Sequence, residues 1–245
     1  NAFCISSKLS LMATKIYFIT GASRGLGLEF VSQLQRAGHT VIATARKPEA
    51  SEGLQKLVDN KQIYSFALDT LDDKSIDAVI KKVEQIAPDG VDVLINNAGI
   101  SAPSGSTTLK AAASDYVKVF ETNVVGTSNI TQKLLPLLQK KKERKIFNIS
   151  SILGSIEHTY AGANAPYGVS KAAENMFTKT LAEDLKGDNF TVLAIHPGWV
   201  QTDMGGASAP LVAKDSIAGM LSVFDKASPQ STGKFLDYQG KELPW

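Results

Sequence analysis

The chain has 245 residues, 43% of them hydrophobic, and its 26 basic and 24 acidic side chains give a formal net charge of +2. This length suffices for one sizeable hydrophobic core, and the balanced charge argues against binding to nucleic acid or to an anionic membrane. The single cysteine, Cys4, excludes an internal disulfide framework and a cysteine metal cluster. The sequence therefore favours a reducing compartment and predicts a cytoplasmic location. No apolar run reaches the roughly 18 residues that a membrane span requires.

The first eleven residues precede Met12, where "MATKIYFITG" reads as a natural start. They lack the arginines of a transit peptide and the apolar length of a signal peptide, so we interpret residues 1–11 as a cloning remnant or a frayed extension. Residues 12–245 contain no linker and no low-complexity tract, and they are predicted to form a single domain.

From Lys15 onward, short apolar runs alternate with longer segments of helical period, which is typical of βαβ units around a parallel sheet. The seven predicted strands are residues 15–20, 40–45, 63–68, 91–96, 145–150, 191–196 and 233–238. The pattern predicts an α/β fold with a doubly wound, seven-stranded parallel sheet flanked by helices.

Three of the predicted helices carry apolar residues at spacings of three and four, and we expect these stripes to face the core. The stripes are Leu26, Phe30 and Leu34 in the first helix; Ile76, Val79, Ile80 and Val83 in the third; and Tyr116, Val117, Phe120 and Val124 in the fourth. Gly38 and Pro88 are expected to mark the ends of the first and third helices.

The segment "TGASRGLG", residues 20–27, lies between the first strand and the first helix. Gly21, Gly25 and Gly27 have no side chains, so the backbone can turn tightly and approach a pyrophosphate. The N-terminus of the helix offers free amides and a positive dipole to the same group. The position between strand and helix favours a dinucleotide site, and an ordinary tight turn is the alternative.

The end of the second predicted strand indicates which dinucleotide binds. An NAD site usually carries a carboxylate there, but this chain has Ala45, followed by Arg46. Arg24 in the glycine turn adds a second cation, and two guanidinium groups can clamp the 2′-phosphate of NADP. The alternative is that both arginines are solvated surface residues. The missing acid favours NADP.

Further motifs follow in order: "LD" at 68–69, "NNAG" at 96–99, Asn123 in "ETNVVG", "NISSILG" at 148–154, "YGVSK" at 167–171 and "HPGWVQT" at 196–202. With the glycine turn, they make the chain resemble the short-chain dehydrogenases/reductases from about Lys15 to the C-terminus. The runs "HPGWVQTDMGG" and "GKFLDYQGKELPW" are similar to those of the C-factor-like and Sniffer-like carbonyl reductases. The resemblance implies a Rossmann-type fold and carbonyl chemistry.

Tyr167 and Lys171 lie four residues apart in a predicted helix. A free tyrosine titrates near about 10, so an unaided phenol holds its proton too firmly to respond near neutrality. A cation one turn away on the same face favours the phenolate, so Tyr167 can exchange a proton with a carbonyl oxygen. The resemblance implies that Lys171 also binds the nicotinamide ribose hydroxyls. Without the other motifs, such a pair would read as an ordinary helix surface.

Ser150 and Ser151 follow the fifth strand, and the carboxyl ends of parallel strands are where ligands bind. The family pattern, a serine followed three residues later by glycine, matches Ser151 with Gly154. It implies that Ser151 bonds the substrate oxygen and that Ser150 is its structural neighbour. No histidine and acid motif accompanies them, so a nucleophilic serine is not expected.

For Asn123, the resemblance implies a local widening of its helix and a bound water that links Lys171 to solvent. A satisfied core asparagine is the alternative.

The resemblance extends to the remaining cofactor contacts. The residues expected to bind NADP are Gly21, Ser23, Arg24, Gly25, Leu26, Gly27, Arg46, Asp69, Asn96, Ala98, Gly99, Tyr167, Lys171, Pro197, Gly198, Val200 and Thr202. Asp69 is expected to accept from the adenine amino group, Asn96 to brace the sheet, and Thr202 to bond the carboxamide. His196 is expected to be structural, and no residue spacing predicts a metal site.

These expectations describe an NADPH-dependent reductase that transfers hydride to a ketone or aldehyde, reversibly with alcohols, with Tyr167 as general acid and base. The alternative is an NADP-binding sensing or signalling protein with little turnover. The set Asn123, Ser151, Tyr167 and Lys171 favours the enzyme. The expected partners are a small carbonyl or alcohol substrate and a second copy of the chain. The resemblance implies pairing through residues 113–138 and 166–186, as a homodimer, with a tetramer as the alternative. Residues 155–166 are expected to form a wall over the substrate, and the segment after Thr202 a mobile cover, with Trp199, Met204 and Trp245 as pocket candidates.

Overall fold

The structure is a computed structural model that describes residues 14–245. The strands are β1 (Ile16–Thr20), β2 (Thr40–Ala45), β3 (Ile63–Ala67), β4 (Val93–Asn96), β5 (Arg144–Ile149), β6 (Phe190–His196) and β7 (Lys234–Asp237). The α-helices are α1 (Gly25–Arg36), α2 (Glu52–Gln55), α3 (Asp73–Ile86), α4 (Ala113–Phe120), α5 (Gly126–Gln139), α6 (Ala165–Asp184) and α7 (Ala213–Lys226). The expectations for residues 1–11, including Cys4, lie outside the described residues. Within residues 14–245, no helix has the length and apolar content needed to span a membrane.

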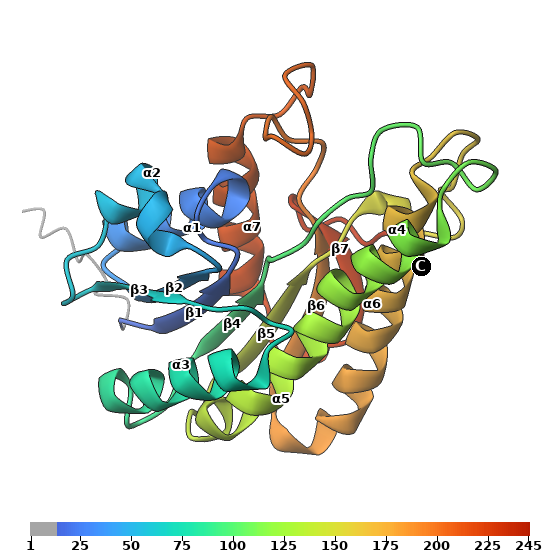
Figure 1. The fold of residues 1–245 in the computed structure, drawn as a ribbon. Helices are drawn as coiled ribbons and strands as arrows, with labels where there is room; N and C mark the ends of the chain where they lie inside the picture. The colour runs from blue at the N-terminus through green and yellow to red at the C-terminus, as the bar shows by residue number, and fades with distance from the viewer. Residues whose placement is uncertain (1–13) are drawn as a thin grey trace, which may run out of the picture.

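All seven strands pair in parallel in the order β3-β2-β1-β4-β5-β6-β7, which confirms the predicted doubly wound sheet. Helices α1 and α7 cover one face, and α3, α5 and α6 cover the other (Figure 1). The strand order reverses direction between β1 and β4, and ligands of such sheets bind outside the carboxyl ends of the strands at that point.

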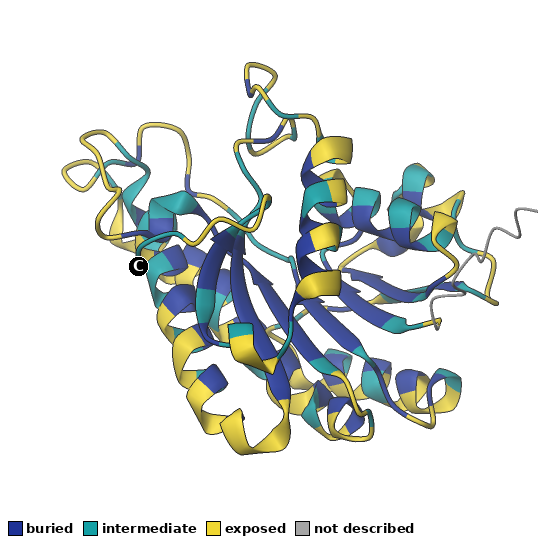
Figure 2. Cartoon of the chain, turned by 180° about the vertical axis from the view of Figure 1, so that it is seen from behind, coloured by how far each residue is buried: buried dark blue, intermediate teal, exposed yellow. Residues whose placement is uncertain are grey.

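The core lies in two layers because alternate strand residues point to opposite faces of the sheet. Ile19 and Val41 pack in the layer under α1 and α7, whereas Phe18 and Ile42 pack in the layer under α3 and α5. Most strand residues are buried, while each large helix has one buried and one exposed face (Figure 2). Such strands read as continuous apolar runs, which is why the sequence predicts them well.

The predicted ends of two helices are also present. Gly38, with φ of 84°, lies two residues past the end of α1, and its left-handed backbone is accessible to glycine at little cost. Pro88 lies two residues beyond the end of α3.

The prediction that the apolar stripe of the fourth helix faces the core is wrong. Val117 is 57% exposed and Phe120 is 42% exposed, while Tyr116 and Val124 are half-buried. The buried positions of this region are Val119 and Asn123. The periodicity identifies an apolar helix face but does not say what covers it, and here α6 packs against the neighbouring face.

Candidate active site

The turn between β1 and α1 is shaped by its glycines. Gly21 and Gly25 have φ of 69° and 54°, a region that side chains other than glycine rarely adopt. Gly27 is needed for space, because a Cβ there would lie 2.2 Å from the Gly21 carbonyl oxygen. Ser23 and Leu26 follow this backbone, and Leu26 packs against the core. The turn thus brings the start of α1 close to the end of β1.

Asn97 holds this turn against the loop that follows β4. Its Nδ2 donates to the carbonyl oxygens of Thr20 and Gly21, at 3.0 Å each, and Thr20 Oγ1 accepts from the amides of Asn97 and Ala98. A Cβ on Gly21 would lie 2.8 Å from Ala98 Cα, so the two loops are in close contact. From the "NNAG" motif, the sequence predicts cofactor contacts for Asn96, Ala98 and Gly99, but it does not predict the role of Asn97.

Asn96 itself is buried beneath the site. Its Nδ2 donates to Thr131 Oγ1 at 3.0 Å and to Asn148 Oδ1 at 2.8 Å, which joins β4 to β5 and α5. Asn148 in turn donates to Thr178 Oγ1 on α6 at 2.8 Å. This polar chain braces the sheet as expected and fixes α6 against it.

The cradle at the start of α1 fits a bound pyrophosphate. The first amides of a helix have no intrahelical acceptor, and the N-cap residue Arg24 provides no capping bond from its side chain. The glycine backbone leaves no side chain between these amides and a ligand. The residues present therefore suit the dinucleotide that the sequence predicts.

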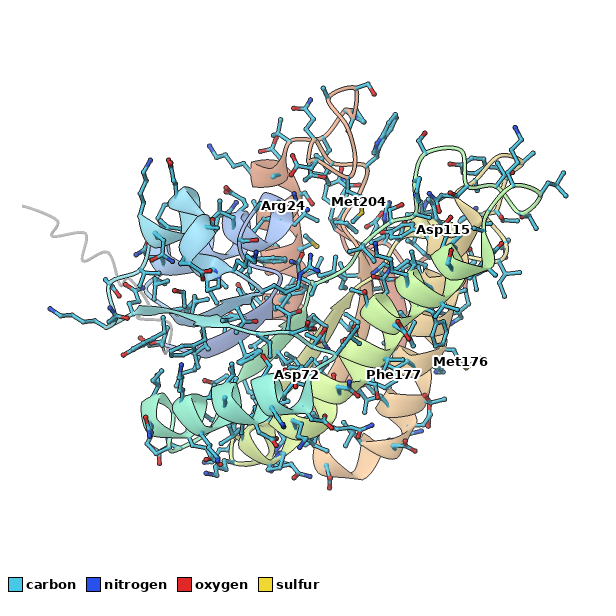
Figure 3. All side chains as sticks on the ribbon, in the orientation of Figure 1. Arg24, Asp72, Asp115, Met176, Phe177 and Met204 are labelled. Carbon is cyan, nitrogen blue, oxygen red and sulfur yellow. The ribbon has the colours of Figure 1, made fainter. Side chains whose placement is uncertain are left out.

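The two predicted phosphate-binding arginines are both exposed and lie at the carboxyl ends of β1 and β2. Arg24 forms an ion pair with Asp203, with Nη1 and Oδ2 at 2.9 Å, and thus connects the glycine turn to the segment after β6. Figure 3 labels Arg24 and Met204 at this end of the molecule. Arg46 follows β2 directly. The Ser51 hydroxyl donates to the Ser23 carbonyl oxygen and joins the two loops.

Tyr167 and Lys171 lie in the first turns of α6, whose start is well defined. Pro166 occupies an early position, and Asn164 caps the helix by accepting from the Tyr167 amide at 3.2 Å. The Asn164 Nδ2 donates to the Ala102 carbonyl oxygen at 3.0 Å, which ties the helix to the loop after β4. Tyr167 is half-buried, whereas Lys171 is 4% exposed.

The Lys171 ammonium is held by two acceptors. Its Nζ donates to the Ile149 carbonyl oxygen at 2.7 Å and to Glu174 Oε2 at 2.5 Å, and it lies 5.8 Å from the Tyr167 ring centroid. Burial lowers the pKa of Lys171, but the Glu174 carboxylate and Tyr167 outweigh it, so the pKa is raised. Burial raises the pKa of Glu174, and Lys171 opposes the rise. The sequence analysis missed Glu174, although its spacing of three from Lys171 places it on the same helix face.

Ser151 is the second residue after the end of β5, and it is buried. Its Oγ accepts from the Leu153 amide at 3.2 Å. Ser150 points elsewhere and donates to Asn175 Oδ1 on α6 at 2.6 Å, as expected of a structural neighbour. A Cβ on Gly154 would lie 2.6 Å from the Lys171 carbonyl carbon, so this glycine allows the turn after Ser151 to contact α6.

His196, at the end of β6, supports the same turn. Its Nδ1 accepts from the Ile152 amide at 3.2 Å. Burial lowers the pKa of His196 to about 4, and Asp237 opposes the shift. The imidazole is therefore neutral near pH 7 and serves as an acceptor, in line with the structural role expected from the sequence.

Asn123 lies in a π-helical turn, Glu121–Val125, between α4 and α5, so the expected local widening is present. The side chain is fully buried and bonds the backbone of Ile100 with both ends, at 2.8 and 2.9 Å, and Ser170 Oγ at 3.0 Å. Gly99 allows a close approach, because a Cβ there would lie 3.3 Å from Asn123 Oδ1 and 3.8 Å from Lys171 Nζ.

The segment after β6 faces the glycine turn. A Cβ on Gly25 would lie 3.4 Å from Thr202 Cγ2, which brings Thr202 beside the pyrophosphate cradle. The Pro197 carbonyl oxygen accepts from Ser216 on α7, Gly198 has φ of 84°, and Val200 is buried. Asp69 lies apart from these residues, exposed after β3, where its carboxylate accepts from the Leu71 amide.

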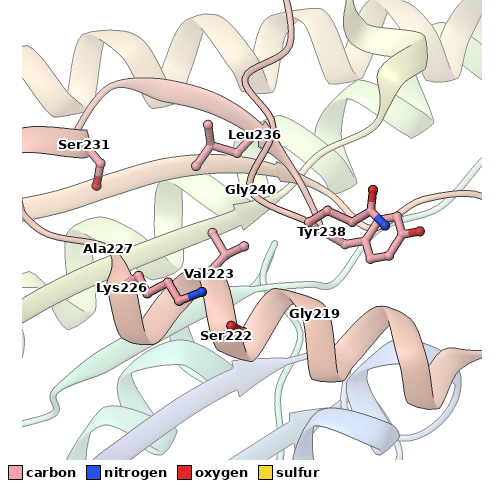
Figure 4. Close-up of a pocket in the computed structure, with 10 residues that line it drawn as sticks. Gly219, Ser222, Val223, Lys226, Ala227, Ser231, Leu236, Tyr238 and Gly240 are labelled. Carbon is pink, nitrogen blue, oxygen red and sulfur yellow. The ribbon is translucent and has the colours of Figure 1, made fainter.

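Two hollows in the surface lie away from the predicted catalytic residues. One runs between α7 and β7 and is lined in part by Val223, Lys226 and Tyr238 (Figure 4). The other lies beneath residues 155–163, and neither Ser151 nor Tyr167 is among its lining residues. The Trp245 carbonyl oxygen accepts from the Ile156 amide at 3.1 Å, so Trp245 supports the predicted wall.

Comparison with known proteins gives the family. A family model described as short chain dehydrogenase matches residues 15–210. C-signal of Myxococcus xanthus is 41% identical over 155 residues, which cover 63% of this chain and 93% of that protein.

Comparison with solved structures leads to the same family. Carbonyl reductase Sniffer of D. melanogaster superposes with a TM-score of 0.90 at 32% identity, covering 95% of this chain and all of that one (100%). The NADPH-bound carbonyl reductase from chicken fatty liver gives a TM-score of 0.90 at 33% identity, over 96% and 100% of the two chains. The chain thus belongs to the short-chain dehydrogenase/reductase family of oxidoreductases, with C-signal and the Sniffer carbonyl reductases among its relatives.

Proposed function

We propose that this chain is an NADPH-dependent carbonyl reductase that acts on a ketone or an aldehyde and operates in reverse on alcohols. The observation that carries the proposal is the buried Lys171 ammonium one turn from Tyr167, beside the β5 end where Ser151 lies. An ammonium next to a phenol supports proton exchange with a reacting oxygen.

The residues of the site have separate tasks. Tyr167 gives its proton to the carbonyl oxygen, and Ser151 Oγ donates a hydrogen bond to the same oxygen and stabilises the charge that develops on it. Lys171 favours the phenolate that remains and orients the ribose. When bound, NADPH supplies the hydride. The glycine cradle holds the pyrophosphate, and the segment 197–202 borders the nicotinamide.

Asn123 contributes through its backbone. Both Nδ2 hydrogens are already donated, to Ile100 and Ser170, so the amide group cannot donate to a water. The Asn123 carbonyl oxygen accepts from Thr127 Oγ1 at 2.9 Å, and a carbonyl oxygen has two lone pairs. We assign the water that links Lys171 to solvent to this carbonyl oxygen.

The preference for NADPH rests on charge. Arg24 and Arg46 are exposed cations beside the cradle, and Ala45 replaces the carboxylate that would repel a 2′-phosphate. The chicken reductase with NADPH bound has the same fold and supports this choice. A cytoplasmic location is part of the proposal, because the single cysteine is typical of a reducing compartment.

Further copies of the chain are the expected macromolecular partner. The exposed apolar side chains Val117, Phe120 and Val125 lie on the α4–α5 helix, and Val169 and Met176 lie on α6. Helices α4 and α6 contact each other, so neighbouring helices carry these residues, and Figure 3 labels Met176 on α6. A two-fold dimer through this side buries them, and a tetramer needs a second contact. Phe120→Glu is expected to yield monomers in sedimentation.

The experiment that tests the proposal is NADPH oxidation with a panel of small aldehydes, ketones and diketones. Tyr167→Phe should lose turnover by about a thousandfold or more, because the phenol is the proton donor, and should retain NADPH binding. Turnover in both proteins would contradict the assigned role of Tyr167. NADPH binding by the parent without turnover on the whole panel would favour the alternative, a sensing protein.

A further inference from the structure

Glu174 is a buried carboxylate that none of the roles above uses. It is 1% exposed and lies on α6, one turn after Lys171. Buried carboxylates are rare unless a cation pairs with them, and the partner here is the ammonium assigned to the reaction. A charge of this kind beside a proton-exchanging group alters the chemistry of that group.

The geometry fixes the ammonium in one direction. A lysine ammonium has three N–H bonds, and within the described residues Lys171 donates one to the Ile149 carbonyl oxygen and one to Glu174 Oε2. One N–H is left, and a Cβ on Gly99, in the loop expected to bind the cofactor, would lie 3.8 Å from Nζ. Two of the three N–H bonds thus hold the ammonium in place, and the third is available to donate to a ligand.

The same pair also cancels charge. A lone Lys171 ammonium would strongly favour the Tyr167 phenolate, whereas the Lys171–Glu174 pair has no net charge when both groups are ionised. Glu174 lies seven residues after Tyr167 on α6, with Lys171 between them, so the carboxylate reduces this attraction without removing it. A reductase requires the phenol form at neutral pH, since only the phenol can donate a proton.

Within residues 14–245, no other ionised group provides this balance. The elements packed against α6 carry His196 on β6, Asp115, Tyr116 and Lys118 on α4, Glu121 in the π-helical turn, and Lys186 and Asp188 in the turn that follows α6, while Arg144 and Lys145 lie at the opposite end of β5. Among the residues that the structure describes, only Glu174 and Tyr167 act on the charge of Lys171 besides burial, and only Lys171 acts on Glu174. His196 is neutral near pH 7.

We propose that Glu174 is a positioning residue that anchors the Lys171 ammonium and offsets its charge, so that Tyr167 stays in the phenol form and the site favours carbonyl reduction. This inference rests on the proposed function for its meaning in catalysis, but the electrostatic coupling itself exists in the cofactor-free protein. It predicts that removal of the carboxylate shifts the phenol toward phenolate, whereas a merely structural ion pair would leave that balance unchanged.

The test is a tyrosinate absorbance titration of the cofactor-free protein. The difference between each protein and its Tyr167→Phe counterpart isolates a single phenol. In Glu174→Gln, which keeps the shape of the side chain, the midpoint should fall by about 1 pH unit while Lys171 remains charged. Glu183→Gln is the matched control, because Glu183 is an exposed glutamate of the same helix that pairs with Lys179 and Lys186, and its midpoint should equal that of the parent.

A second variant keeps the test valid if Glu174→Gln folds poorly. Glu174→Leu removes the carboxylate without burying an amide and should give the same fall. In enzyme that turns over, the high-pH limit of carbonyl reduction should move down by the same amount. Midpoints equal to the parent in both variants would overturn the proposal, whatever their stability. A shifted midpoint in protein without turnover would support Glu174 and count against the reductase assignment alone.

Discussion

The glycine turn after β1 and the buried face of α6 lie at the same end of the sheet but are built differently. The turn consists of backbone, and its geometry is set by Gly21 and Gly27 through left-handed φ and lack of space. The α6 face consists of side chains, and its geometry is set by the Lys171–Glu174 pair. In the glycine turn, a side chain added at Gly21 or Gly27 would collide with backbone atoms, whereas each charged side chain of the α6 face depends on its partner. A second substitution, at the partner, can therefore restore the stability lost by a first substitution only on the α6 face.

Removal of one member of the pair should have the largest effect. Lys171→Met leaves Glu174 buried without a cation, and we expect the free energy of unfolding to fall by about 3–5 kcal/mol at pH 8, as measured by urea unfolding. The loss should shrink on acidification, because Glu174 then takes up a proton.

The double variant Lys171→Met/Glu174→Leu tests whether the two side chains act as a unit. With both charges replaced by apolar groups, most of the lost stability should return, while turnover should not. Equal destabilisation of the single and double variants would show that the pair does not act as a unit, and that the α6 face resembles the glycine turn after all.

Gly27→Ala is the corresponding change in the backbone site. The added Cβ would lie 2.2 Å from the Gly21 carbonyl oxygen and 2.9 Å from Ala22 Cα, so backbone must move. We expect a loss of about 3 kcal/mol in urea unfolding, together with weaker NADPH binding. Gly187→Ala is the control, because a Cβ there has no atom within 4 Å, and it should match the parent. A stable Gly27→Ala variant would mean that the turn is less constrained than its geometry indicates.

The same contrast explains what could be predicted from the sequence. The glycine turn was predicted residue by residue, because its requirements are local and a motif records them. Glu174 and Asn97 were missed, because their importance comes from what lies around them in space. The prediction that the apolar stripe of the fourth helix faces the core was wrong for a related reason. Val117 and Phe120 have the spacing of a helical apolar face, but they are exposed. Local sterics are visible in a sequence, whereas the neighbours of a buried side chain are not.

The glycine turn and the region around His196 should also differ in how their stability depends on pH. The pKa of His196 is lowered by burial to about 4 from 6.5, so between these values the unfolded chain binds a proton that the folded chain does not. The contribution of His196 to the free energy of unfolding is therefore complete above pH 6.5 and is lost as the pH falls toward 4, by about 3 kcal/mol in all.

His196→Asn isolates this contribution. The asparagine oxygen can accept from the Ile152 amide as Nδ1 does, without binding a proton. The parent should lose more stability than the variant between pH 7 and pH 5 in urea unfolding. Parallel curves would show that His196 titrates as a solvated residue. The glycine turn has no such titrating group, so Gly27→Ala should be equally destabilised across this range.

Arg24 is the one side chain at the glycine turn whose proposed role depends on charge, and its loss should have the smallest effect on stability. Both Arg24 and Asp203 are exposed, so Arg24→Ala should change the free energy of unfolding by less than about 0.5 kcal/mol. The main effect of Arg24→Ala should be on cofactor binding. Loss of one charge-assisted contact to the 2′-phosphate should weaken NADPH binding about tenfold and leave NADH binding unchanged.

Asp203→Ala gives the opposite sign. In the cofactor-free protein Asp203 competes for the Arg24 guanidinium, so its removal should leave NADPH binding equal to or tighter than in the parent. Arg36→Ala, which removes an exposed arginine at the far end of α1, serves as the control for net charge. If Arg24→Ala weakens NADPH and NADH equally, then Arg24 contributes to the pyrophosphate cradle rather than to the choice of cofactor. In that case the glycine turn would depend on a side chain after all, and the contrast with α6 would be one of degree.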